Sequence, residues 1–187
     1  LATNNGKAIR FAVEAVRVFR GRDSTGVRGI KLLGNDKVVS MSIITDGEDE
    51  FVLSVTDNGY GKRTPVADYR RTGRGGQGVA NIETSDRNGR VMASFTVVEE
   101  DQLMLVTNYG QVIRIRVHGG EHDSIRIAGR KTLGVRLFDV SGDDDEHVVS
   151  AGLIRDADDE DEDENAIHGD NTGEPHATAT QESNGDA

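Results

Sequence analysis

The sequence predicts an all-β fold of propeller-like repeats, each with about four short strands, followed by a disordered acidic tail. Three short motifs recur in a fixed order with a period of about 52 residues, and self-similarity at a fixed period is the signature of repeat architectures. Apolar runs are short and end at turn residues, and no stretch of useful length has helical periodicity. The repeats occupy residues 1–155 and divide at about 1–50, 51–102 and 103–155.

The three motifs appear once in every repeat. The first is Thr-(Asn/Asp)-x-Gly, with copies that begin at Thr3, Thr56 and Thr107. The second is Gly-Arg-x-x-x-Gly-Val, with copies that begin at Gly21, Gly73 and Gly129. The third is an apolar run that ends in serine at Ser40, Ser94 and Ser150. Because three motifs share one order and one period, the repeat is the main organising feature of the chain.

Each repeat is predicted to open with a β-hairpin. Phe51–Val55 and Leu103–Val106 are apolar runs that lead into turn residues, as buried strands do. Asn5-Gly6 and Asn58-Gly59 are hairpin dipeptides of the kind that a type I′ turn requires. After the third turn, Ile113–Val117 alternates aliphatic and basic residues, which places them on opposite faces of a strand.

A second pair of strands is predicted after a glycine-rich loop. In the first repeat this pair is Val27–Leu33 and Val38–Ile44. One hairpin and one further strand pair in each repeat give the expected four strands, which is the composition of a propeller-like blade.

Charge is strongly segregated along the chain. The net formal charge of −11 divides into +4 for residues 1–140 and −15 for residues 141–187. Residues 156–187 are acidic and polar, and such a segment cannot bury enough apolar surface to offset the entropy lost on folding. We therefore expect 156–187 to be disordered, and we judge what the chain binds from the repeats alone.

The remaining composition narrows the class of protein. No cysteine is present, which excludes disulfides and cysteine-bound metals and is typical of cytoplasmic proteins. No apolar run approaches the roughly 18 residues of a membrane helix, so we expect no membrane contact. There is no signal peptide. The chain opens with Leu1, and we take it to be a fragment of a longer protein.

Each repeat carries a basic loop beside its second motif. We predict that these loops bind DNA through Arg20, Arg22, Arg28, Arg70, Arg71, Arg74, Arg126, Arg130, Lys131 and Arg136. Guanidinium groups match the geometry of phosphate oxygens, and neighbouring glycines let a backbone approach a phosphate closely. A basic loop is often only solvated surface, and that interpretation stays open. Three such loops at one structural period instead suit a curved polyanion.

The expected ligand is duplex DNA, bound without regard to sequence. Proteins that bind single strands stack bases on exposed aromatic rings, and these loops contain almost none besides Phe19 and Tyr69. Base reading in the major groove normally uses an inserted helix or ribbon, and no candidate helix is present. The remaining mode of nucleic-acid binding is contact with the phosphates of a duplex.

Three motifs that suggest other chemistry are set aside. Gly73–Gly78 fits the dinucleotide fingerprint, but a strand rather than a helix is expected to follow it. His118–His122 fits an H-x-x-E-H zinc pattern, but Gly119-Gly120 opposes the helix that this pattern needs. The run from Asp156 resembles the start of an EF-hand loop but has Asp161 where that loop requires glycine. We predict no catalytic residue, cofactor site or metal site in this chain.

Five segments around the recurring motifs match a known pattern: Asn5–Phe11, Gly26–Ile30, Asn58–Thr64, Gly73–Val79 and Gly129–Leu137. They resemble the family of C-terminal domains found in bacterial DNA gyrase A. The resemblance covers residues 1 to about 155. It implies a β-pinwheel of about six blades whose basic rim wraps duplex DNA, of which this chain holds the last three or so. The Gln-(Arg/Lys)-Arg-Gly-Gly-(Arg/Lys)-Gly box of the family's first blade is absent.

The resemblance also implies properties of the longer protein. These are an ATP- and Mg²⁺-dependent type II topoisomerase activity that introduces negative supercoils, assembly with gyrase B and with a second copy of gyrase A, and a cytoplasmic, nucleoid-associated location. Two alternatives stay open: the C-terminal domain of topoisomerase IV, and a propeller-like scaffold for protein interactions. A further hypothesis is that the acidic tail competes with DNA for the basic loops.

Overall fold

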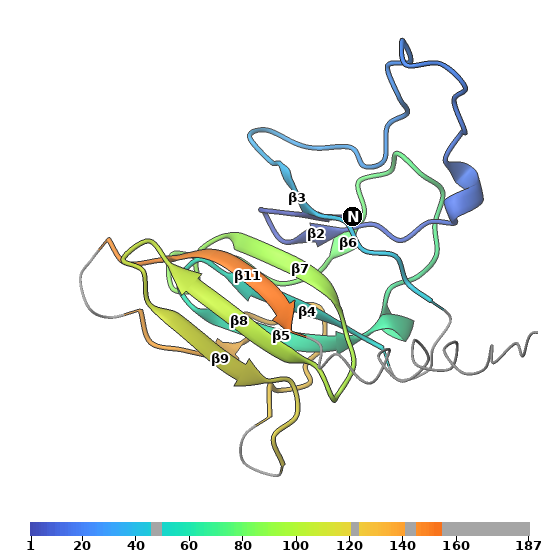
Figure 1. The fold of residues 1–187 in the computed structure, drawn as a ribbon. Coiled ribbons are helices and arrows are strands. Elements are labelled where there is room, and N and C mark those ends of the chain that lie inside the picture. The colour runs from blue at the N-terminus through green and yellow to red at the C-terminus, as the bar shows by residue number, and fades with distance from the viewer. Residues whose placement is uncertain (46–49, 121–123, 141–144, 155–187) are drawn as a thin grey trace, which may run out of the picture. The chain divides into compact units, whose positions relative to one another are not determined.

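The computed structural model describes residues 1–45, 50–120, 124–140 and 145–154. The predicted disordered tail, residues 156–187, lies outside the described residues. The regular secondary structure of the described residues is almost entirely β-strand (Figure 1), as the sequence predicts, and long loops connect the strands. Two single-turn 3₁₀ helices, η1 (Val13–Ala15) and η2 (Val66–Asp68), occupy matching places in the first two repeats.

Three antiparallel sheets follow one another along the chain. The first has the order β3-β1-β2-β6, with bounds Val38–Ser40, Ala2–Thr3, Lys7–Ala8 and Val79–Ala80. The second has the order β10-β5-β4-β7, with bounds Val135–Arg136, Tyr60–Pro65, Phe51–Thr56 and Val91–Val97. The third has the order β11-β8-β9, with bounds Val148–Ile154, Gln102–Thr107 and Val112–Arg116.

The fourth strand of a sheet comes from the following repeat. Strand β6 of the second repeat pairs with β2 of the first, with Lys7 opposite Ala80. Strand β10 of the third repeat pairs with β5 of the second, with Tyr60 opposite Arg136. The third sheet has three strands in the described part of the chain. Four strands for a blade are therefore confirmed in two sheets, but each of these sheets is built from two repeats.

We call this pairing of a strand with the sheet of the preceding repeat strand exchange. It explains why one predicted strand does not form. The sequence predicts a strand at Val27–Leu33 in the first repeat, yet none forms there. Its counterparts, β6 and β10, are strands because each pairs with the sheet of the preceding repeat. No sheet precedes the first repeat within the described chain, so the backbone of Val27–Leu33 has no edge to pair with. The second predicted strand of this pair, Val38–Ile44, forms only over Val38–Ser40 and pairs with β1.

The opening hairpin of each repeat is confirmed, but its turn type differs from the prediction. The backbone N–H of Gly59 donates to the carbonyl of Thr56 at 3.1 Å, and the two other repeats have the same bond. Asn58 and Gly59 are therefore not the two central residues of a type I′ turn. Gly59 instead follows the turn with φ +74°, as in a three-residue hairpin loop.

The same glycine position shows how closely the exchanged segment packs. A Cβ added to Gly59 would lie 2.5 Å from the carbonyl oxygen of Phe138, just after β10. A Cβ on Gly134 would lie 2.7 Å from the carbonyl oxygen of Gly61. At Gly110, the counterpart of Gly59 in the third repeat, nothing lies within 4 Å. Two glycines thus allow one repeat to meet the next.

The main apolar core joins the second and third sheets. Figure 1 shows β7 and β11 side by side, and their residues are in contact. The core comprises Leu53, Val55, Val97, Leu103, Leu105, Val117, Ile125 and Val148, all buried. Because these residues come from two repeats, burying them stabilises the two blades together.

Candidate nucleic-acid interface

The ten basic residues predicted from sequence divide into two groups by exposure. Eight are exposed: Arg20, Arg22, Arg28, Arg70, Arg71, Arg126, Lys131 and Arg136. Arg74 and Arg130 are half-buried. The exposed group includes residues from all three repeats, so each basic loop presents cations to solvent.

Arg74 and Arg130 occupy the same motif position and bind the preceding repeat. The Nε of Arg74 donates to the carbonyl of Ala15 at 3.1 Å, and its Nη1 donates to the carbonyl of Arg28. The Nη1 of Arg130 donates to the carbonyl of Ala80 at 3.1 Å. The motif arginine therefore connects neighbouring repeats and has fewer donors free for phosphate than the exposed group.

Arg71 lies beside the first repeat. Its Nη2 is 3.8 Å from a carboxylate oxygen of Glu14, and both side chains are exposed. Such a pair contributes little in water. The neighbouring backbone is better fixed, because the N–H of Thr72 donates to the carbonyl of Arg10 at 2.9 Å.

Lys62, which sequence reasoning missed, holds the basic loop of the third repeat. Its side chain is fully buried, and Nζ donates to the carbonyls of Gly129 at 2.5 Å and Arg130 at 3.0 Å. Burial, with a smaller contribution from the charge of Arg130, lowers the pKa of Lys62 to about 8. Lys62 acts on the loop from within the fold and cannot itself reach a ligand.

Arg63, the next residue, is also committed to the fold. Its Nε donates to the carbonyl of Ile125 at 2.8 Å, and Nη1 lies 3.1 Å from a carboxylate oxygen of Glu99. The guanidinium carbon is 4.9 Å from the centroid of the Phe51 ring. No sequence signal marks these two basic residues as buried, because the exchanged segment that covers β5 comes from the next repeat.

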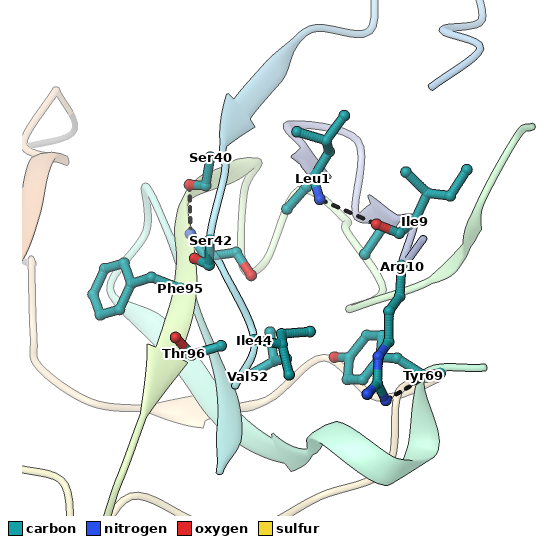
Figure 2. Close-up of a pocket in the computed structure, with 13 residues that line it drawn as sticks. Leu1, Ile9, Arg10, Ser40, Ser42, Ile44, Val52, Tyr69, Phe95 and Thr96 are labelled. Atoms are coloured by element: carbon teal, nitrogen blue, oxygen red, sulfur yellow. Dashed lines mark hydrogen bonds between the residues drawn. The ribbon is translucent and has the colours of Figure 1, made fainter. Parts of the chain in front are cut away.

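A small cavity lies between the first sheet and strands β4 and β7 (Figure 2). It has a volume of about 50 Å³ and is lined largely by apolar groups, with Val52, Tyr69 and Phe95 among them. Ligand pockets are typically several hundred Å³ or more, roughly 300–1,000 Å³. This cavity has room for water but not for a nucleotide.

Beside the cavity, buried polar side chains connect the first two repeats. The hydroxyl of Tyr69 donates to Asn81 Oδ1 at 2.5 Å, and Asn81 Nδ2 donates to Ser54 Oγ at 2.9 Å and to Ser94 Oγ at 3.2 Å. Ser94 N–H in turn donates to Ser40 Oγ at 2.8 Å, across to the first sheet. Burial raises the pKa of Tyr69 to about 12, so its hydroxyl stays protonated.

Two motifs that suggested a cofactor site or a metal site lie wholly or partly within the described residues. Strand β6 follows Gly73–Gly78, as predicted, where a dinucleotide site would need a helix. His118 follows β9 outside any helix, while Glu121 and His122 lie outside the described residues. Within the described ranges, no three His, Asp or Glu side chains gather in a way that could hold a metal ion, and no helix there is long and apolar enough to cross a membrane.

The family model described as "DNA gyrase C-terminal domain, beta-propeller" matches residues 1–45, 50–97 and 101–155. The chain belongs to this family. The membership predicted from the motifs is thereby confirmed, and so is the pinwheel fold class.

Gyrase relatives agree with the family match. The DNA gyrase A protein of Salmonella typhimurium is 46% identical over 165 residues, which cover 88% of this chain and 17% of the relative. That of Rickettsia bellii is 37% identical over 210 residues, covering 88% of this chain and 22% of the relative. This gyrase-family chain thus spans about a fifth of the length of these relatives.

Two solved structures share the fold. The C-terminal domain of a DNA topoisomerase IV has a TM-score of 0.72 and 25% identity, covering 82% of this chain and 45% of that one. A DNA gyrase A C-terminal domain has a TM-score of 0.70 and 24% identity, covering 82% of this chain and 49% of that one.

Proposed function

We propose that this chain is the part of a DNA gyrase A protein that binds and wraps duplex DNA without reading its sequence. The observation that carries the proposal is the recurrence of exposed cations on the loop beside the same motif in every repeat. Arg28, Arg71 and Lys131 exemplify the three loops. Contacts between neighbouring repeats hold the loops, and cations that recur with the repeat suit a bent polyanion.

The expected binding is electrostatic. Each phosphate that a Lys or Arg neutralises releases condensed counterions, so affinity falls as salt rises. Residues 1–140 have a net charge of +4, which favours binding to a polyanion although the whole chain has a net charge of −11. The eight exposed residues of the predicted set are seven arginines and one lysine. They bind phosphates and offer no aromatic ring on which an unpaired base could stack.

The longer protein is proposed to be an ATP-dependent type II topoisomerase that introduces negative supercoils, active with gyrase B and a second copy of gyrase A in the nucleoid-associated cytoplasm. Its ATP and Mg²⁺ would be held by parts of that assembly other than this chain. Within the described residues, no three His, Asp or Glu side chains gather into a metal site. The glycine-rich run Gly73–Gly78 leads into strand β6 and not into the helix that a dinucleotide site needs. We likewise place no catalytic residue here.

Duplex binding across a salt series tests this proposal. The 187-residue chain is titrated against a fluorescent duplex of mixed sequence and against a second duplex of unrelated sequence. We expect equal affinities for the two duplexes and a log–log salt dependence with a slope of about −0.9 per phosphate contact. Salt-insensitive binding, or no binding at low salt, would favour the protein-interaction scaffold instead.

Topoisomerase IV remains a second candidate for the longer protein, favoured by the topoisomerase IV domain with a TM-score of 0.72. Against it, the curated relatives described above are gyrase A proteins. The full-length protein, paired with its ATPase partner, distinguishes the two activities. Introduction of negative supercoils into relaxed plasmid supports gyrase, whereas decatenation without supercoiling supports topoisomerase IV.

A further inference from the structure

Tyr60 holds two arginines that come from different repeats. Its ring is buried on β5, and its hydroxyl oxygen accepts hydrogen bonds from Arg87 Nε at 3.3 Å and Arg136 Nη2 at 3.5 Å. The two guanidinium carbons lie 5.6 and 5.7 Å from the ring centroid. Arg87 precedes β7, whereas Arg136 is on the exchanged strand β10. We call Tyr60, Arg87 and Arg136 the arginine clamp.

The clamp has more positive than negative charge. Arg136 lies 3.2 Å from a carboxylate oxygen of Asp139. For Arg87, no carboxylate of the described residues lies within ion-pair distance. One carboxylate thus faces two cations. Hydrogen bonds from both guanidinium groups also lower the pKa of the Tyr60 hydroxyl, which fits a positive local potential.

The two guanidinium groups are also arranged in advance. Both arginines are exposed, while Tyr60, whose ring lies under them, is a buried residue. A free arginine side chain loses conformational entropy when it binds, and stacking on a ring reduces that loss. Each guanidinium uses one nitrogen toward Tyr60, which leaves further N–H donors for an anion with several oxygens.

We propose that Arg87 and Arg136 together bind one phosphate of the DNA backbone, with Tyr60 as the positioning residue. The inference rests on the proposed function and extends it to a site that the sequence motifs do not mark, since Arg87 lies outside the basic loops. Cations near one acceptor repel each other, and a phosphate between them would relieve that repulsion while accepting hydrogen bonds from both.

Among the described residues, the clamp is found only where the second and third repeats meet. In the first sheet, the position of Tyr60 is taken by Lys7 and that of Arg136 by Ala80. In the third repeat the position is Gln111, which has no exchanged strand beside it in the described chain. The site is therefore a local feature and not a general property of the repeat.

The test compares single and double variants of the 187-residue chain in duplex binding. Arg87→Gln and Arg136→Gln should each weaken binding at low salt by about 5- to 10-fold and reduce the salt slope by up to about 0.9. Because both residues share one phosphate, the double variant should lose little more than either single variant. Tyr60→Phe, which keeps the ring but lacks the acceptor, should weaken binding by a smaller factor and leave the slope unchanged.

Arg116→Gln is the matched control. It removes the same charge from an exposed position on β9, in the third sheet, whereas Tyr60 and Arg136 are on strands of the second sheet. Losses of affinity that match this control, or losses that add fully in the double variant, would overturn the clamp while leaving the proposed function intact. Failure of the unaltered chain to bind duplex DNA would instead refute the proposed function itself.

Discussion

Replacing the hairpin glycines by alanine tests the strand exchange directly. Gly59 and Gly110 occupy the same turn position with φ of +74° and +82°. An L-residue in this left-handed region costs on the order of 1 kcal/mol at both sites. The sites differ in what a new Cβ would meet, because Gly59 faces the carbonyl oxygen of Phe138 at 2.5 Å and Gly110 faces open space.

The extra loss at Gly59 follows from that contact. The added methyl must displace the segment after β10, and overpacking of this kind typically costs about 1–3 kcal/mol. The bond from the Leu137 N–H to the Gly59 carbonyl, 2.9 Å long, would be strained as well. We therefore expect Gly59→Ala to lower the free energy of unfolding by about 2–4 kcal/mol and Gly110→Ala by about 1 kcal/mol.

Urea unfolding followed by far-ultraviolet circular dichroism measures this difference. Gly6→Ala provides a second case, because its Cβ would also meet a backbone carbonyl of the following repeat, that of Ile82. It should behave like Gly59→Ala. Equal destabilisation by Gly59→Ala and Gly110→Ala, to within about 0.5 kcal/mol, would refute the conclusion that the following repeat packs on this turn.

Three further predictions concern charge and buried polar groups. Since the pKa of Lys62 falls from 10.5 to about 8 in the folded protein, the unfolded chain binds more protons between these values. Raising the pH from 8 to 10 should therefore stabilise the unaltered protein relative to Lys62→Met, by about 2 kcal/mol; a constant difference in urea titrations would contradict this. Tyr69→Phe should cost about 1–3 kcal/mol by leaving a buried Asn81 oxygen unpaired, whereas Tyr109→Phe, at an exposed residue, should not change the melting temperature. Deleting residues 156–187 removes twelve acidic residues and no Lys or Arg, so duplex affinity should rise several-fold at low salt but not at high salt; an unchanged low-salt affinity would exclude competition by the tail.

The sequence was sufficient for the repeats, the hairpins and the exposed basic residues. The hairpins β4–β5 and β8–β9 could be predicted because short apolar runs and turn glycines are local signals. The partner of β10 could not be predicted, since two residues carry no information about which sheet edge they join. For the same reason Lys62 and Arg63 gave no sign of burial, although both lie within the fold.

The sequence was also insufficient to show which basic residues of the site are exposed. Arg74 and Arg130 read as loop cations like their neighbours, because their carbonyl partners belong to another repeat. Arg87 stood outside the predicted set, because only the folded chain brings it to Tyr60. Residue type thus predicts the kind of ligand, and contacts between repeats determine which of the predicted cations are exposed.

The exchange of strands has a consequence for how this protein is made. During synthesis, the second blade cannot complete its sheet when residue 102 leaves the ribosome, because β10 at Val135–Arg136 has not yet emerged. Its β5 edge would stay open for the time needed to translate another 34 residues, from 103 to 136. An open strand edge is a site for wrong pairing. A truncation that is meant to keep the second blade intact should therefore end beyond the exchanged strand, after about residue 138, and not at the repeat boundary.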